Sequence, residues 1–201
     1  MLFDFENDYI LENNFVQLRP LTVLDIPVLL PFSEQEPELW NYSLIKATNE
    51  KELINYVNLA FEGRKHKREY AFVVYDKIQQ KIAGSTRFYD INLNNKSLQL
   101  GFTWYGKAFQ GTGMNKQCKL LLLDFAFDFM QMERVEFRAD NQNKPSIAAM
   151  KRIGCVEEGV LRSNFIKPNG ERRSSIVMSI LKSEWEQSVK ANLEELCVGN
   201  K

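Results

Sequence analysis

A glycine-punctuated loop directly before an apolar helix constrains this chain more than any other stretch. The loop spans residues 105–116 and holds glycines at positions 106, 111 and 113. An apolar run typical of a strand, residues 98–104, precedes it, and an apolar helical run, residues 117–127, follows it. A helix N-terminus after such a turn presents several unpaired backbone N–H groups, and the aligned peptide dipoles make it mildly positive. We therefore expect this loop to bind a phosphate group.

Length and charge are typical of one soluble globular domain. The chain has 201 residues, enough for one buried core and too few for two independent ones. Its 26 Lys and Arg residues balance 26 Asp and Glu residues, so no overall field favours nucleic acid or an anionic membrane. No apolar run approaches the ~20 residues that a membrane span needs, and the acidic start is unlike a signal peptide. We expect a cytoplasmic protein without nucleic-acid or membrane partners.

Cysteine and histidine usage excludes several kinds of site. Cys118, Cys155 and Cys197 lie far apart and form no CxxC pair, which favours reduced thiols over disulfides or a zinc site. The single histidine, His66, lies in a charged run, residues 64–68, that reads as a solvated helix end. We therefore expect no metal and no histidine-centred catalysis.

The spacing of apolar residues predicts strands and helices along the whole chain. Three strands before the loop follow one another with short turns, so they are expected to pair antiparallel. The strand after the loop needs a helical crossover and is expected to pair parallel. Strands are expected at residues 15–19, 70–75, 81–89, 98–104, 134–138, 156–166 and 172–180, and helices at 26–32, 49–61, 113–131, 145–154 and 183–196, with an irregular connection at 33–42. The predicted fold is α/β (α+β), with a mixed, mostly antiparallel central sheet of about seven strands flanked by helices.

Six segments, taken in order, resemble the GNAT family of N-acetyltransferases. Gln110-Gly111-Thr112-Gly113 resembles the Q/R-x-x-G-x-G/A loop with which that family binds acyl-CoA. The other segments resemble its RimJ/RimL-like branch, which includes ribosomal-protein N-terminal acetyltransferases: residues 18–21, 101–104, 134–136, 143–155 and 158–162. The resemblance covers about residues 15–185, and we expect a single GNAT-like domain over residues 1–201 that ends in the helix at about 183–196.

Two positions depart from the family pattern. Asn115 replaces the final Gly or Ala of the loop, as in a related subset with Gly-x-Gly-x-Asn. Gln99 stands where relatives often place a glutamate that is a candidate general base, and glutamine cannot ionise. Asp90, Glu136 and Glu158 are other carboxylates near strand ends, each more typical of a solvated or paired group.

The resemblance implies acetyl-CoA as acyl donor and CoA as product. The loop would hold the pyrophosphate, and a strand segment that parts from its neighbour would pair with the pantetheine arm and offer an N–H to the thioester oxygen. Asn143 would bond the pantetheine or thiol region, and Ser146 would donate a hydrogen bond or proton to the sulfur, unless it only satisfies its helix's first turn. The expected cofactor-binding residues are Phe102, Thr103, Trp104, Tyr105, Gln110, Gly111, Thr112, Gly113, Met114, Asn115, Lys116, Asn143, Ser146 and Lys151.

The acceptor is expected to be a primary amine, either a small molecule or a protein N-terminus. Trp40, Arg87 and Tyr89 are the candidate substrate-binding residues, and packing is the alternative role for each. An α-amine has a pKa of ~7.7–8.0, so direct attack in a ternary complex needs no strong base.

A catalytically quiet acyl-CoA-binding or sensing protein is the alternative function. A nucleotide-binding P-loop is disfavoured because no Gly-Lys-Ser/Thr follows the glycines. A homodimer is left open.

Overall fold

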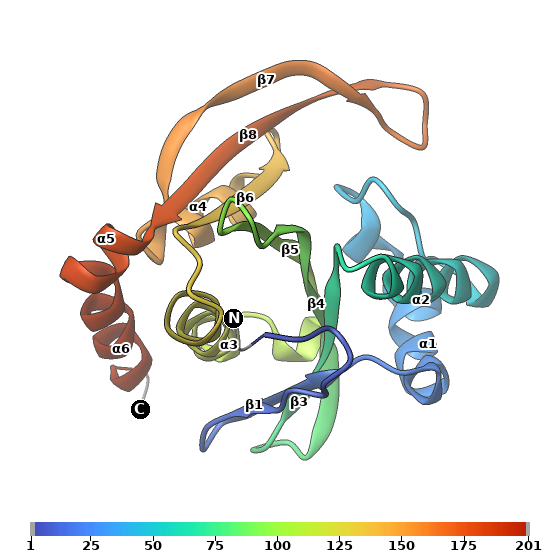
Figure 1. Cartoon of the computed structure of the whole chain (residues 1–201). Coiled ribbons are helices and arrows are strands. Elements are labelled where there is room, and N and C mark those ends of the chain that lie inside the picture. Colours follow the sequence, from blue (N-terminus) through green and yellow to red (C-terminus); the bar gives the residue numbers. More distant parts are fainter. Residues whose placement is uncertain (1–2, 200–201) are drawn as a thin grey trace.

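One eight-stranded sheet, ordered β1-β2-β3-β4-β5-β6-β8-β7, organises the computed structural model, which describes residues 3–199 (Figure 1). The strands are β1 (Leu11–Glu12), β2 (Val16–Pro20), β3 (Tyr70–Asp76), β4 (Lys81–Asn92), β5 (Ser97–Tyr105), β6 (Arg134–Asp140), β7 (Val156–Ile166) and β8 (Arg172–Leu181). All neighbours pair antiparallel except β5 and β6, which pair parallel as predicted. The mixed α/β fold class is confirmed, and the strand beyond the predicted seven is β1, whose two residues are too short to show a pattern.

The helices follow the predicted order: α1 and α2 extend further than predicted, α3 and α4 end earlier, and π turns follow α3 and α5. They are α1 (Ile26–Gln35), α2 (Glu50–Lys65), α3 (Met114–Asp124), α4 (Lys144–Arg152), α5 (Lys182–Glu184) and α6 (Lys190–Val198), with 3₁₀ turns η1 (Val23–Asp25), η2 (Pro37–Trp40) and η3 (Lys107–Phe109) and π turns η4 (Phe125–Phe129) and η5 (Trp185–Val189). The connection at 33–42 is more helical than predicted, because α1 continues to Gln35 and Pro37 starts η2. Proline suits a first helical position, where its missing N–H costs nothing.

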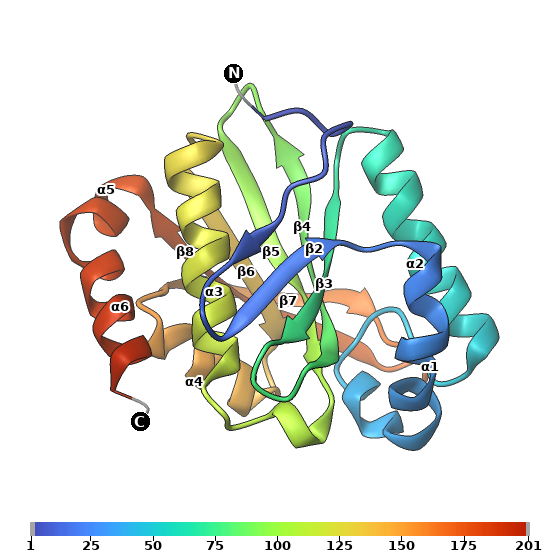
Figure 2. The same ribbon diagram turned by 90° about the horizontal axis from the view of Figure 1, so that it is seen from below.

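The two faces of the sheet bury separate cores. On β3, Tyr70, Phe72 and Val74 pack into the core under α3, while Ala71 and Val73 pack into the core under α1 and α2. This alternation follows from the two-residue period of a strand. Figure 1 shows the two helical layers on opposite sides of the central strands, and Figure 2 shows α3 and α2 from below.

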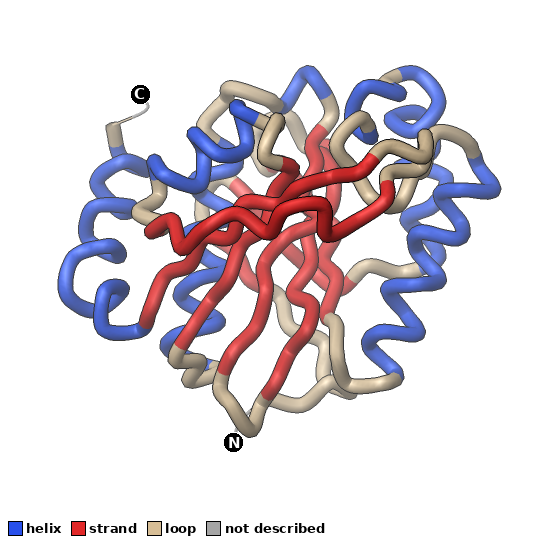
Figure 3. The backbone as a smooth tube through the Cα atoms, turned by 90° about the horizontal axis from the view of Figure 1, so that it is seen from above, coloured by secondary structure: helices blue, strands red, loops and turns tan. Residues whose placement is uncertain are grey.

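The long β7–β8 hairpin lies across the other strands when the chain is seen from above (Figure 3). β8 pairs with β6 along seven residues of each strand, so the crossing reflects strong twist within one sheet. Among residues 3–199, no helix is long and apolar enough to cross a membrane.

Candidate active site

The glycine loop adopts backbone angles that favour glycine. Gly111 and Gly113 have φ of +74° and +87°, in the left-handed region, and Gly113 is the N-cap of α3. Gln110 Nε2 donates to the Tyr105 carbonyl at 2.8 Å and Thr112 Oγ1 donates to the Phe109 carbonyl at 2.8 Å, which folds the loop back onto the end of β5. A Cβ on Gly111 would meet no atom within 4 Å, so it would project into open space.

Several backbone amides of the loop have no acceptor in the protein. Among the described residues, the N–H groups of Gly111, Thr112, Gly113 and Asn115 donate no hydrogen bond, whereas the Met114 N–H has a weak partner in Thr112 Oγ1 at 3.4 Å. The N-cap is a glycine, so no side chain satisfies them from that position. Unpaired donors at the positive end of a helix form an anion site, and the loop fits the pyrophosphate that the resemblance implies.

β5 and β6 part beside this loop. They pair only from Ser97–Arg134 to Gln99–Glu136, although β5 continues to Tyr105 and β6 to Asp140. The β4–β5 register also shifts at a bulge around Phe102, which has φ of +49°. The edge of β5 that faces β6 therefore has no ladder partner beyond Gln99, as the resemblance implies for residues 102–105.

Side chains of this strand segment face alternate sides of the sheet. Phe102 and Trp104 pack against the core under α1 and α2, while Tyr105 belongs to the core under α3. Tyr105 donates its hydroxyl hydrogen to Asn115 Oδ1 at 3.3 Å. Thr103 Oγ1 accepts a hydrogen bond from Lys119 on α3 at 3.1 Å. The Asn115 amide oxygen therefore braces the loop against β5.

At the start of α4, the helix cap is a different residue from the candidate hydrogen-bond donor Ser146. Asn143 Oδ1 accepts the Ser146 backbone N–H at 3.2 Å, so Asn143 is the N-cap. The Ser146 hydroxyl is half-buried and forms no hydrogen bond within the described residues. Capping is thus done by Asn143, which leaves the Ser146 hydroxyl available. Lys151, one of the expected cofactor-binding residues, has its ammonium 2.9 Å from Glu157.

Two of the three candidate substrate-binding residues lie in the core. Trp40 is 2% exposed and packs against Tyr56 and Trp104. Arg87 is 1% exposed, and its guanidinium pairs with Glu69 at 2.6 Å. Both side chains therefore act mainly through packing in this structure.

Tyr89 is the more accessible of the three. It is half-buried, and its ring meets that of Phe102 edge-on, with centroids 5.0 Å apart. Burial raises the pKa of its phenol above the ordinary value, so the hydroxyl stays protonated at neutral pH.

The candidate carboxylates near strand ends are all engaged. Asp90 accepts a hydrogen bond from Gln99 Nε2 at 2.9 Å. Glu136 accepts from Arg134 at 2.8 Å and lies beside Arg138 as well. The hydrogen bond from Arg134 lowers the pKa of Glu158 and so weakens it as a base. Each of these carboxylates is therefore held by a hydrogen-bond donor or an arginine, which disfavours it as a general base.

Lys119 is a buried cation beside the candidate site that the sequence pattern did not single out. It is 6% exposed and interrupts the apolar face of α3 between Cys118 and Leu122, both buried. Burial lowers the pKa of its ammonium to about 8. A lysine on an apolar helical face was the available signal, but its depth and neighbours depend on how α3 packs.

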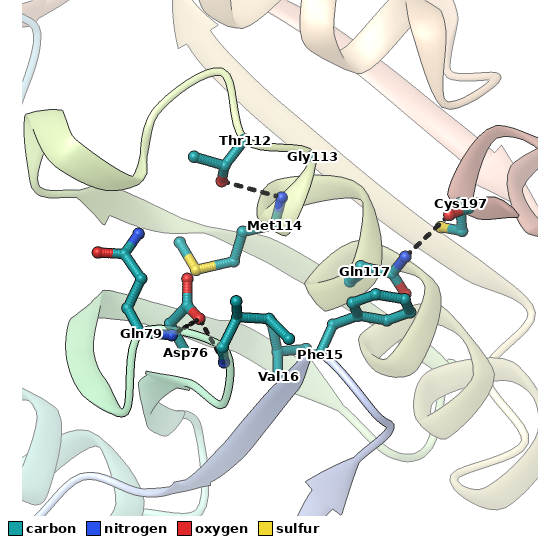
Figure 4. Close-up of a pocket in the computed structure, with 10 residues that line it drawn as sticks. Phe15, Val16, Asp76, Gln79, Thr112, Gly113, Met114, Gln117 and Cys197 are labelled. Atoms are coloured by element: carbon teal, nitrogen blue, oxygen red, sulfur yellow. Dashed lines mark hydrogen bonds between the residues drawn. The ribbon is translucent and has the colours of Figure 1, made fainter. Parts of the chain in front are cut away.

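A cavity of about 240 Å³ lies between the loop and the turn after β3 (Figure 4). The Met114 side chain points into it, toward the turn after β3. There Asp76 Oδ1 accepts the N–H groups of Ile78 and Gln79, which uses that oxygen of the carboxylate for the turn. Open space therefore borders the loop there too. Within residues 3–199, no cluster of three His, Cys, Asp or Glu residues is placed to hold a metal ion.

Comparison with known proteins shows the family to which the chain belongs. Residues 16–156 match the acetyltransferase (GNAT) domain model. This chain belongs to the GNAT acetyltransferase family. It is 30% identical over 105 residues to the Bacillus subtilis (strain 168) protein named "Putative ribosomal N-acetyltransferase YdaF", a match that spans 52% of this chain and 56% of YdaF.

Solved structures of GNAT proteins have the same fold. A GCN5-related N-acetyltransferase from Brucella melitensis superposes with a TM-score of 0.85 at 23% identity, covering 96% of this chain and 86% of that one. Mycobacterium smegmatis RimJ, solved with CoA-disulfide, has a TM-score of 0.77 at 19% identity, covering 94% and 93%. Several relatives of this chain are named N-acetyltransferases, and the chain is an enzyme of that class with a RimJ-like fold.

Proposed function

We propose that this chain transfers the acetyl group of acetyl-CoA to the α-amine of a protein N-terminus. The observation that carries the proposal is the position of the unpaired loop amides, from Gly111 to Asn115, beside the opening between β5 and β6. The site thus has anion-binding amides at the loop and an unpaired strand edge along β5. This combination suits a ligand that has a diphosphate and a long arm with amide groups. The RimJ neighbour was solved with a CoA derivative.

Each part of this site has a separate task toward the cofactor. The backbone of residues 110–116 binds the pyrophosphate, and the edge of residues 102–105 pairs with the pantetheine amides. Acetyl-CoA supplies an acyl carbon activated as a thioester. The bulge at Phe102 interrupts the β4–β5 ladder, and in this proposal a backbone N–H of the segment stabilises negative charge on the acyl oxygen.

The chain directs attack without a strong base. The carboxylates near the strand ends are held by hydrogen bonds or arginines, and the Gln99 side chain cannot ionise. An α-amine with a pKa of ~7.7–8.0 is partly neutral at physiological pH, so the enzyme needs only to bind and orient it. Ser146 donates a hydrogen bond to the departing sulfur from the start of α4, and Asn143 orients the same region.

Two observations favour a protein N-terminus over a small amine. YdaF is named as a ribosomal N-acetyltransferase, and the M. smegmatis neighbour is a RimJ protein. Tyr89, whose ring meets that of Phe102 at the bulge, is the residue that we propose contacts the amine. Lys151 binds the 3′-phosphate only after it exchanges Glu157 for that group.

Calorimetry with CoA, followed by a CoA-release assay, tests the proposal. The protein is offered acetyl-CoA with N-terminal peptides of varied first residues and with small amines such as polyamines and aminoglycosides. We expect CoA binding and faster release with some peptides than with any small amine. Failure to bind CoA overturns the proposal, faster release with a small amine overturns the acceptor class, and binding without turnover establishes the acyl-CoA-sensing alternative.

A further inference from the structure

Lys119 on α3 is a buried lysine whose ammonium lies at the opening between β5 and β6. Its Nζ is 3.1 Å from Thr103 Oγ1 on β5 and 5.6 Å from the ring centroid of Phe137 on β6. Both contacts lie beyond Gln99 and Glu136, the last paired residues of the two strands. The ammonium therefore reaches the part of the sheet where the strands have separated, from the face that α3 covers.

No carboxylate neutralises this charge. Within residues 3–199, Lys119 forms no salt bridge, and Thr103 Oγ1 is the one hydrogen-bond acceptor of its three-proton ammonium. The titratable groups whose charge acts on it are the thiols of Cys118 and Cys155. Burial raises the pKa of both thiols to about 12, so they are neutral at physiological pH.

A buried cation without an anion strongly favours a ligand that develops negative charge beside it. The low dielectric of the interior strengthens that attraction, and two ammonium protons remain free to donate. Lys119 lies six residues beyond Gly113, about 9 Å along the helix axis. The Lys119 ammonium is therefore well separated from the loop amides. A ligand that contacts both would place its phosphates at the loop amides and a different group at Lys119.

We propose that Lys119 is a catalytic residue whose ammonium donates a hydrogen bond to the sulfur of CoA and stabilises the departing thiolate. The inference rests on the proposed function. In the reaction the amine nitrogen forms its bond to the acyl carbon, the carbon–sulfur bond breaks, and the sulfur keeps the electron pair. The proton of the amine passes to water, and Lys119 stays protonated throughout. Ser146 approaches the same sulfur from α4, so the two donors act together.

The test compares CoA with desulfo-CoA, in which hydrogen replaces the thiol, by calorimetry between pH 6.5 and 9. The variant is Lys119→Met, which keeps the side-chain volume and removes the charge. Lys65→Met, a change of the same kind at an exposed position near the end of α2, is the control. Ultraviolet absorbance of the thiolate in the bound complex reports sulfur ionisation directly and needs no acceptor.

In the wild type and the control we expect the bound thiol to ionise at least one pH unit below its ordinary pKa of ~8.5, a tenfold effect. The preference for CoA over desulfo-CoA should peak between about pH 8 and 8.5 at roughly twofold, because only a minority of free partners are then thiolate and ammonium together. Below that range free CoA keeps its thiol proton, and above it Lys119 of the unliganded protein loses its own proton, since its pKa is about 8. In Lys119→Met the peak should vanish and the bound thiol should ionise above ~8.5, because the site becomes apolar.

The outcomes separate the two proposals. If the wild type binds neither CoA nor desulfo-CoA, both the proposed function and the role of Lys119 fail. If it binds CoA but the thiol keeps its ordinary pKa, only the role of Lys119 fails, and this wild-type measurement decides even if Lys119→Met does not fold. Equal thiol ionisation in wild type and Lys119→Met also overturns it and leaves Lys119 as a packing residue.

Discussion

At Gly111 the absence of a side chain keeps the space beside the loop amides open. We predict that Gly111→Glu weakens CoA binding on the order of 100-fold, because a carboxylate would occupy the phosphate position and the loss of one or two charge-assisted hydrogen bonds is of that size. Gly170→Glu is a matched control, since Gly170 has φ of +85° and also faces open space, in the turn between β7 and β8. Calorimetry with CoA measures both; equal losses in the two variants would mean that backbone strain alone is responsible.

Ser146 gives a second prediction at the residue scale. We expect Ser146→Ala to lower kcat by up to about 10²-fold, the usual range for a proton or hydrogen-bond donor, with little change in CoA affinity. Stability should not change, since the hydroxyl forms no hydrogen bond within the described chain. Steady-state kinetics and urea unfolding provide the two readouts. A wild-type kcat would exclude the serine as a donor to the sulfur.

At the scale of elements, α4 depends on its N-cap. Asn143→Ala should reduce the free energy of unfolding by about 1 kcal/mol, since the Ser146 N–H loses its acceptor. Asn143→Ser restores a capping oxygen and should recover that stability, while the shorter side chain no longer reaches the cofactor. CoA affinity should therefore stay reduced in both variants. Recovery of affinity together with stability in Asn143→Ser would show that Asn143 acts only through the helix.

The elements themselves were largely predictable, and their departures have local causes. The loop, α3 and the crossover to β6 follow from glycine spacing and helical periodicity, and the parallel β5–β6 pair is the consequence. The bulge at Phe102 was not predictable, because an apolar strand residue with positive φ carries no sequence signature. The burial of Trp40 and Arg87 was also not predictable, because an aromatic residue in an irregular connection or a cationic residue in a strand suits a cleft as well as a core.

For the whole molecule, Lys119 is a stability cost. Its pKa falls from 10.5 to about 8 on folding, and this shift corresponds to about 3 kcal/mol of destabilisation at neutral pH. Because the folded pKa is the lower one, the unfolded chain binds more protons between these values, so the Lys119 contribution to stability rises with pH from about 8 to 10.5.

We therefore predict that Lys119→Met is more stable than the wild type at pH 7 by about 3 kcal/mol, as expected when an apolar residue of similar volume replaces a buried charge. The difference should shrink above pH 8. Urea unfolding at several pH values measures it, and the other titrating groups are common to both proteins and cancel. A less stable Lys119→Met at pH 7 would show that the ammonium is satisfied in the fold, which contradicts its role as a free cation.

The sequence by itself determined the parts of the site that depend on near neighbours. The left-handed glycines of the loop, the helix that begins at Met114 and the cap at Asn143 involve residues within four positions of one another, so local pattern suffices to predict them. The family resemblance implied the opening between β5 and β6, but tertiary structure alone decided the position of Lys119 beneath it. Register, burial and the absence of a neutralising carboxylate depend on segments far apart in the chain, and no short pattern specifies them. The glycine loop thus indicates the cofactor, and the packing of α3 against the sheet places the Lys119 ammonium where we propose that the sulfur binds.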